Sequence, residues 1–188
     1  MKPNLRSTAF LATFFLIAPV LALAKTPATP EKLNQLYAEY WEENLQANPL
    51  TATRIGDSRF NDRYGAVTSA ERLATTKRIA EKYLARTAGF DPAGLPAEDR
   101  ISYDLLRYNL QQSLDALKFP SHLTPLNQIF GQHLSFAQLG SGNGMQPFKT
   151  VQDYDNFLKR LNGFVAWTDQ AIVNMKQGVQ RGYTLPKV

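Results

Sequence analysis

The spacing of the apolar residues constrains the fold of this chain more than any other feature. After Pro30, apolar side chains recur every three or four residues, as far as the next proline at Pro49: Leu33, Leu36, Tyr37, Tyr40, Trp41 and Leu45. This interval places them on one wide stripe of an α-helix. No alternating run in the sequence is long enough to require a β-strand. The predicted class is therefore all-α.

Three further segments show the same period. A helix is predicted from Thr68, which forms a capping-box pattern with Glu71, to about Thr87. The next runs from Pro96 to Pro120, and the last begins at Thr150. The apolar residues of these last two helices are Ile101, Leu105, Tyr108, Leu110, Leu114 and Leu117, then Tyr154, Phe157, Leu158, Leu161, Val165, Ile172 and Met175.

The segments between these helices lack a helical period. Residues 49–67 and 119–149 are rich in glycine, proline and small polar residues, which is typical of irregular connections. Short helical turns are predicted around residues 126–130 and 136–139. The expected fold is an antiparallel, bundle-like helical domain of about four main helices with one long irregular loop.

The N-terminus has the three parts of a secretory signal peptide. Lys2 and Arg6 are followed by an apolar stretch over residues 9–23, and residues 22–24 (Ala-Leu-Ala) form a cleavage signal. Cleavage is predicted between Ala24 and Lys25, because the apolar run is short for a membrane anchor. We therefore expect a signal peptide over 1–24, a linker over 25–30 and a helical domain over 31–188. The product is predicted to be periplasmic or secreted, with no stable membrane span.

Composition and charge limit the possible chemistry. The chain has no cysteine, which rules out disulfides and cysteine-ligated zinc. Its net charge is +5, but the bases between residues 54 and 81 alternate with acids, so nucleic-acid binding is not expected.

The two histidines, His122 and His133, do not form the His-Glu-x-x-His motif of zinc hydrolases. Ser135 and Ser141 lie near His133 without a Gly-x-Ser-x-Gly motif, which leaves an independent serine hydrolase as a remote alternative. We assign no catalytic residue, metal ligand or cofactor to this chain.

Several motifs, in this order, resemble the bacterial domain of unknown function 885 (DUF885) family. They are Asn48-Pro-Leu-Thr-Ala-Thr-Arg-Ile-Gly-Asp57, Phe60-Asn-Asp62, Asp99-Arg-Ile-Ser-Tyr-Asp-Leu-Leu106, Pro125-Leu-Asn-Gln128 with Gly131, Asp153-Tyr154 and Gly178-Val-Gln-Arg-Gly-Tyr-Thr-Leu-Pro186. The resemblance implies a mostly helical, often exported, zinc-dependent peptidase that is longer than this chain. It also implies that the zinc-binding His-Glu-x-x-His and a further glutamate ligand lie downstream of the matched region.

The leading hypothesis is an exported N-terminal fragment of such a peptidase, truncated before the zinc motif and inactive alone. The resemblance implies a downstream catalytic region, or a separate chain carrying it, as partner. It also implies zinc and a peptide-like substrate only for the full-length protein. The alternative is a non-enzymatic periplasmic binding or interaction module. Asn127 and Gln128 are candidate substrate-binding residues because they lie in the long loop; alternatively, they satisfy backbone groups of that loop.

The export hypothesis is tested by the intact mass of the native protein, captured from its source cells with an antibody to residues 31–47. We expect the captured protein to begin at Lys25, because signal peptidase removes residues 1–24. A product near the mass of residues 25–188 would favour the binding module or a separate catalytic chain. A much heavier product would favour a full-length peptidase, and retention of residues 1–24 would contradict cleavage.

Overall fold

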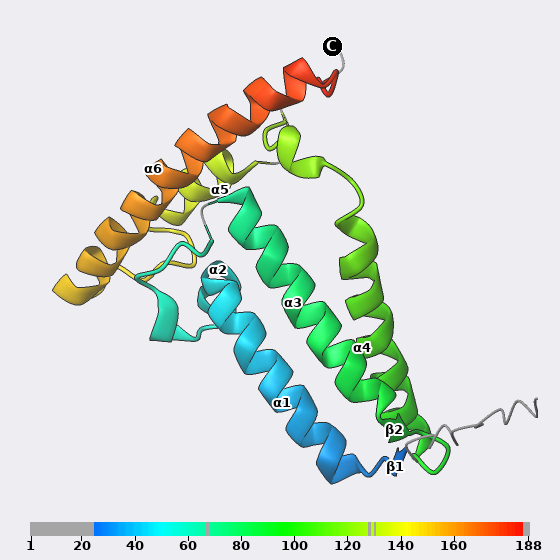
Figure 1. Ribbon diagram of the computed structural model, residues 1–188. Helices are drawn as coiled ribbons and strands as arrows, with labels where there is room; N and C mark the ends of the chain where they lie inside the picture. Colours follow the sequence, from blue (N-terminus) through cyan, green and yellow to red (C-terminus); the bar gives the residue numbers. More distant parts are fainter. Residues whose placement is uncertain (1–24, 67, 128, 130, 186–188) are drawn as a thin grey trace, which may run out of the picture.

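The computed structural model describes residues 25–66, 68–127, 129 and 131–185 (Figure 1). The predicted signal peptide therefore lies outside the described residues. The helices are α1 (Pro30–Ala47), α2 (Pro49–Arg54), α3 (Ser69–Ala88), α4 (Ala97–Ala116), α5 (Gln132–Leu139) and α6 (Val151–Gln180), with the short 3-10 helices η1 (Ser58–Phe60) and η2 (Ser121–Leu123). In this part of the chain, the only strands are β1 (Thr26–Pro27) and β2 (Phe90–Asp91), which pair in parallel. The all-α prediction is confirmed.

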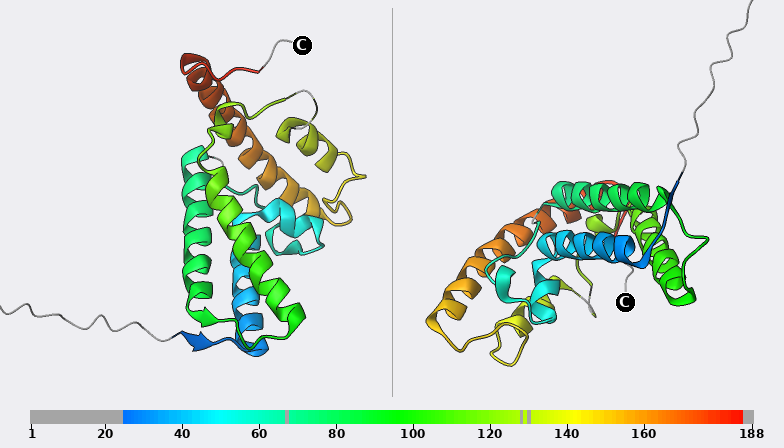
Figure 2. Two further views of the ribbon diagram at one scale, coloured as in Figure 1. Left: turned by 90° about the vertical axis from the view of Figure 1, so that its right-hand side faces the viewer. Right: turned by 90° about the horizontal axis from the view of Figure 1, so that it is seen from below.

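Helices α1, α3 and α4 lie side by side and alternate in direction (Figures 1 and 2). The β1–β2 pair joins the start of α1 to the end of α3 at the foot of this group. The long helix α6 crosses the opposite end obliquely, and α5 lies against it. The predicted antiparallel arrangement is therefore present, with the fourth main helix lying across the other three.

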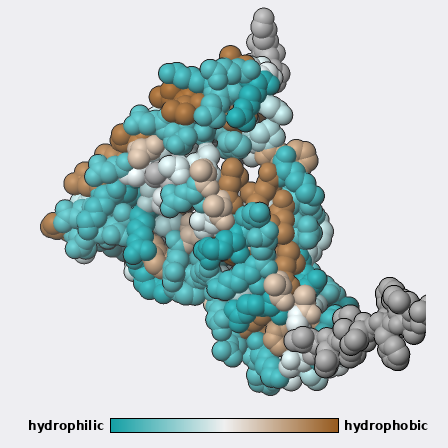
Figure 3. Space-filling model, in the orientation of Figure 1, coloured by the Kyte–Doolittle hydropathy of each residue, from teal (hydrophilic) through white to brown (hydrophobic). Residues whose placement is uncertain are grey.

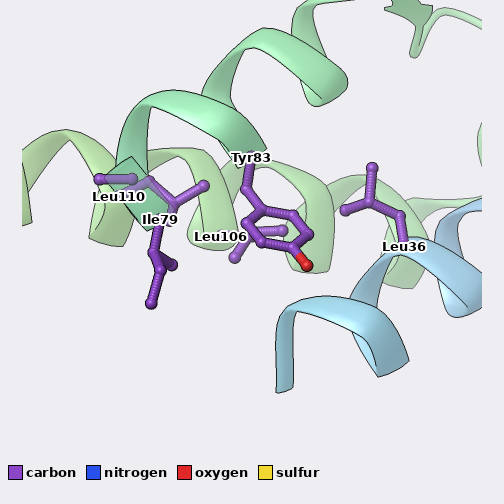
Figure 4. Close-up of a cluster of buried hydrophobic side chains, with 6 residues drawn as sticks. Leu36, Ile79, Tyr83, Leu106 and Leu110 are labelled. Atoms are coloured by element: carbon purple, nitrogen blue, oxygen red, sulfur yellow. The ribbon is translucent and has the colours of Figure 1, made fainter. Parts of the chain in front are cut away.

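The core between α1, α3 and α4 is a compact set of apolar side chains (Figure 4): Leu36, Ile79, Ala80, Tyr83, Leu106 and Leu110. The ring of Tyr83 is 1% exposed and meets Tyr40 edge-to-face at 5.2 Å between ring centroids. Half of the six residues predicted for the apolar face of α4 are exposed. Ile101, Leu105 and Tyr108 are exposed, whereas Tyr103, Leu106 and Leu110 are buried.

Local signals set the helix starts as predicted. The Thr68 side chain accepts a hydrogen bond from the backbone N–H of Glu71 at 3.1 Å. Thr150 and Asp153 form a complete capping box at the start of α6.

The prediction that residues 49–67 are wholly irregular is wrong. Pro49 ends α1 and also begins α2, because proline suits the first position of a helix. In the second loop, the turn predicted at 136–139 is confirmed and belongs to the longer α5. The turn predicted at 126–130 lies partly outside the described residues, and an isolated antiparallel bridge joins Leu126 and Gly131.

A buried arginine ties α6 to the α2–η1 region. Arg160 is 0% exposed. Its Nε donates to the carbonyl of Arg63 at 2.8 Å, and its Nη2 donates to the Thr53 hydroxyl at 2.9 Å and the Phe60 carbonyl at 2.8 Å. Its Nη1 donates to the side-chain oxygen of Gln146. No carboxylate of the described residues lies within ion-pair distance of this guanidinium.

We expect Arg160→Met to lower the free energy of unfolding by about 3–5 kcal/mol, because the substitution leaves buried acceptors without a donor. Urea denaturation followed by circular dichroism measures the change. Lys159→Met is the matched control on the exposed side of the same helix and should change stability by less than about 0.5 kcal/mol. A loss below about 1 kcal/mol for Arg160→Met would contradict the structural role of this residue.

A second polar contact joins α1 to α3. The carboxylate of Glu43 accepts hydrogen bonds from Lys82 Nζ at 2.6 Å, from the Tyr83 hydroxyl at 3.0 Å and from Arg78. Partial burial alone raises the pKa of Glu43, but the hydrogen bonds from Lys82, Arg78 and Tyr83 outweigh burial and lower that pKa to about 2.

Because the pKa of Glu43 is lower in the folded state, its stabilising contribution is present above the unfolded-state value of about 4.3 and is lost as the pH falls towards 2. Glu43→Gln should lower the free energy of unfolding by about 1–2 kcal/mol at pH 7, since Arg78 and Lys82 are half exposed. The difference from the unsubstituted protein should vanish near pH 2. Glu81→Gln, which removes an exposed ion pair with Lys77, is the control. An equal effect of Glu43→Gln at both pH values would refute the linkage.

Candidate functional site

The main hollow of the described structure lies where α2, α3, α5 and α6 meet. It consists of two cavities of about 380 Å³ and about 250 Å³, both lined by Arg72, Gln132, Ser135 and Trp167. We call these two cavities together the Arg72 cleft. Arg72 also lines a third cavity, of about 210 Å³, between α1, α3 and α4. One cation thus stands at the junction of three hollows.

Four elements place the residues of this cleft. Arg72 lies in the first turn of α3, immediately after the Thr68 cap, and Arg54 is the last residue of α2. Gln132 begins α5, and Trp167 is on the buried face of α6. The cleft therefore exists only because distant parts of the chain converge.

Stacked aromatic rings hold α5 against α6. The rings of Phe136 and Phe164 stack at 4.2 Å between centroids, and Phe136 also stacks on Phe157 at 5.5 Å. The α6 helix passes close to Tyr64, because a Cβ atom at Gly163 would lie 2.5 Å from the Tyr64 Cβ atom. A glycine within α6 thus permits the close approach that brings Tyr64 to the cleft.

Tyr64 supplies a protonated hydroxyl in the smaller cavity. This hydroxyl donates a hydrogen bond to the Gln132 side-chain oxygen at 3.4 Å. Burial raises the pKa of Tyr64 to about 12, and the positive charge of Arg72 opposes that rise only in part. The group therefore remains a hydrogen-bond donor at neutral pH.

The charge around the cleft has one sign. Arg54 and Arg72 both line the smaller cavity, and no Asp or Glu is among the described residues that line any of the three cavities. Neither arginine forms an ion pair with another described residue. Such a site can hold an anionic group. Over the described ranges, no group of three or more His, Asp or Glu residues is placed to hold a metal ion.

The residues of the hydrolase alternative are scattered. Ser135 and His122 line the larger cavity, and His122 Nδ1 is buried without a hydrogen-bond partner among the described residues. His133 is exposed, and the Ser141 hydroxyl donates to the Gln138 carbonyl at 2.8 Å. In the described part of the chain, no hydrogen bond joins either serine to a histidine.

The candidate residues from the sequence lie elsewhere. Asn127 is exposed, and its side-chain oxygen accepts a hydrogen bond from the Ile129 N–H at 2.9 Å. It does not line the Arg72 cleft, whereas Gln128 and Ala24 lie outside the described residues and Lys25 is exposed.

Sequence reasoning did not single out Arg72. One signal was available: the positions three and four residues away on either side hold only Ser or Thr. Arg72 therefore has no acid at helical ion-pair spacing, unlike Lys77 with Glu81.

A second feature is an exposed apolar stripe along α6, which we call the α6 stripe: Val151, Tyr154, Leu158, Leu161, Val165, Ile172 and Val179. Figure 3 shows hydrophobic surface along the outer edge of this helix. The residues follow three-four spacing, with Thr168 and Met175 at the intervening positions. The apolar face predicted for the last helix therefore exists, but most of it is exposed. The buried face lies about a third of a turn away: Arg160, Trp167, Ala171, Asn174 and Gly178.

Of the comparisons with known proteins, the one with family models gives a match. The profile described as "Bacterial protein of unknown function (DUF885)" matches residues 49–188, which includes all of α2 to α6. No curated protein and no solved structure gives a significant match. Among the helices of the described residues, none is both long enough and apolar enough to cross a membrane.

Proposed function

Because the chain belongs to the bacterial DUF885 family, we propose that it forms the helical N-terminal part of an exported zinc-dependent peptidase. In this proposal the zinc ligands come from a catalytic part outside residues 1–188, and the chain is inactive alone. The substrate is peptide-like. Export rests on the charged, apolar and Ala-Leu-Ala segments of residues 1–24.

The α6 stripe is the observation that carries this proposal. Val151 is 80% exposed and Val179 66%, at the two ends of a 30-residue helix. Apolar residues repeated at three-four spacing over several turns form the contact face for another helix. A contiguous apolar face of this length is uncommon on a free surface and marks an interaction site. The occupant that we propose is a helix of the catalytic part.

A second candidate function is favoured by the Arg72 cleft. An accessible hollow whose lining combines apolar side chains with two arginines that form no ion pair with any described residue suits a binding module that performs no catalysis. In that case the periplasmic or secreted protein would capture a ligand by itself. The two functions differ in whether native protein carries zinc and cleaves peptides.

The peptidase proposal is tested on protein captured from the source cells with an antibody to residues 31–47. We expect the captured material to contain zinc and a polypeptide with His-Glu-x-x-His, in the same chain or an associated one. It should cleave peptides, lose that activity with a chelator and regain it with zinc. Purified residues 1–188 should show no cleavage. Chelator-sensitive cleavage by residues 1–188 alone would contradict the division of roles.

Two double substitutions distinguish the contribution of the α6 stripe to activity from that of the rest of the helix. In the captured species, Leu158→Glu with Val165→Glu should lower activity at least about tenfold, because two charges would enter an apolar contact. Gln152→Glu with Gln177→Glu places the same charges on exposed positions of α6 outside the stripe, and should change activity less than about twofold. Equal activity of the two double variants would exclude the stripe as a docking face. The same conclusion would follow if purified residues 1–188 stayed strictly monomeric at high concentration.

A further inference from the structure

The Arg72 cleft combines two cations with neutral hydrogen-bond donors. Arg54 and Arg72 contribute guanidinium groups, the Tyr64 hydroxyl remains protonated, and Gln132 and Ser135 add an amide and a hydroxyl. An arginine that faces a cavity without an acid is free to bind an anion, and guanidinium groups pair with carboxylates through two parallel hydrogen bonds.

The same cavity also has apolar side chains in its lining. Trp167, Met145, Leu139 and Leu50 line it beside the two arginines. Trp167 is 5% exposed and Leu139 4%, so their positions are fixed by packing. A free phosphate ion would make no use of this surface. A ligand that fits both parts carries one negative charge on an apolar body.

We propose that the Arg72 cleft binds the carboxylate of a small apolar acid, such as the C-terminal residue of a peptide with an aliphatic side chain. Arg72 holds the carboxylate, with Arg54 and the Tyr64 hydroxyl beside it. The aliphatic body lies against Trp167 and Leu139. The volume of about 250 Å³ is below the roughly 300–1,000 Å³ of pockets for drug-sized ligands, so it suits one or two residues.

The geometry also explains why Arg72 forms no ion pair with another described residue. Elsewhere on α3, Arg78, Lys82 and Arg86 all pair with glutamates of α1. Arg72 lies nearest the α6 end of α3, beyond that row of acids. Because Arg72 is exposed and faces the cavities without a neighbouring acid among their lining residues, its guanidinium is available to an anion.

Binding can be followed by the fluorescence of Trp167. The chain has two tryptophans, and Trp41→Phe removes the other, which lies on α1 and lines none of the cavities. The probes are N-acetyl-L-leucine and its neutral isostere N-acetyl-L-leucinamide, titrated into the full chain at pH 7. We expect the acid to bind at least about tenfold more tightly than the amide, because only the acid can pair with Arg72.

Substitutions assign the effect to the cleft. Arg72→Gln should weaken acid binding at least about tenfold and abolish the preference for acid over amide. Tyr64→Phe should weaken it by a smaller factor, since only one hydroxyl is lost. Lys77→Gln removes an exposed cation from the same helix, outside the cavities, and should change binding less than about twofold. Arg72 is exposed, so its substitution should leave the thermal unfolding midpoint of the chain nearly unchanged.

Any of the following results would overturn the inference: no binding of the acid up to about 10 mM, equal binding of acid and amide, or an unchanged affinity in Arg72→Gln. Inorganic phosphate is the third probe, and displacement of the acid by phosphate at equal concentration would exclude an apolar acid as the preferred ligand. The assay uses the chain without zinc or a partner. A negative result in this binding assay would not bear on the peptidase proposal. Absence of zinc from the captured protein would not bear on the ligand proposed for the cleft.

Discussion

The structure depends on a buried positive charge, that of Arg160, which forms no ion pair with any carboxylate of the described residues. Burying the Arg160 guanidinium is costly, and hydrogen bonds must offset most of that cost. Its acceptors come from α2, from the end of η1 and from the loop before α6, at Thr53, Phe60, Arg63 and Gln146. One side chain thus joins segments about a hundred residues apart. Because Tyr64 follows one of these carbonyls directly, the same contact also sets the position of a cleft residue.

The orientation of α6 follows from this constraint. Rotating the helix to bury its apolar stripe would remove Arg160 from its acceptors and expose Trp167, whose ring stacks near Phe164 at 5.9 Å. The face that carries polar and aromatic groups is therefore the inner one, and Gly163 allows it to approach Tyr64 closely. With α6 held obliquely across the other helices, the hollow beside Arg72 is left between them.

The elements that the sequence predicts well are those with local causes. Thr68 and Thr150 cap their helices through contacts three residues away, and these two starts could be predicted within one residue. The buried face of α6 could not, because three-four spacing occurs on two adjacent faces and the choice between them depends on distant acceptors. The six residues of α2 are too few to show a period. The cleft escaped prediction for a related reason, since Arg72 and Trp167 meet only through tertiary packing.

The two proposed surfaces share one helix. Trp167 faces the cleft, and Leu158 and Val165 lie on the stripe roughly half a turn away, on the opposite side of α6. A helix packed on these residues would therefore lie on the side of α6 away from Trp167, and no residue of the stripe lines either cavity of the cleft. If a catalytic part docks there, a peptide whose C-terminal carboxylate is held by Arg72 would have to pass around α6 to reach it. The ligand proposed for the cleft and the helix proposed for the stripe therefore occupy opposite sides of α6, and neither would block the other.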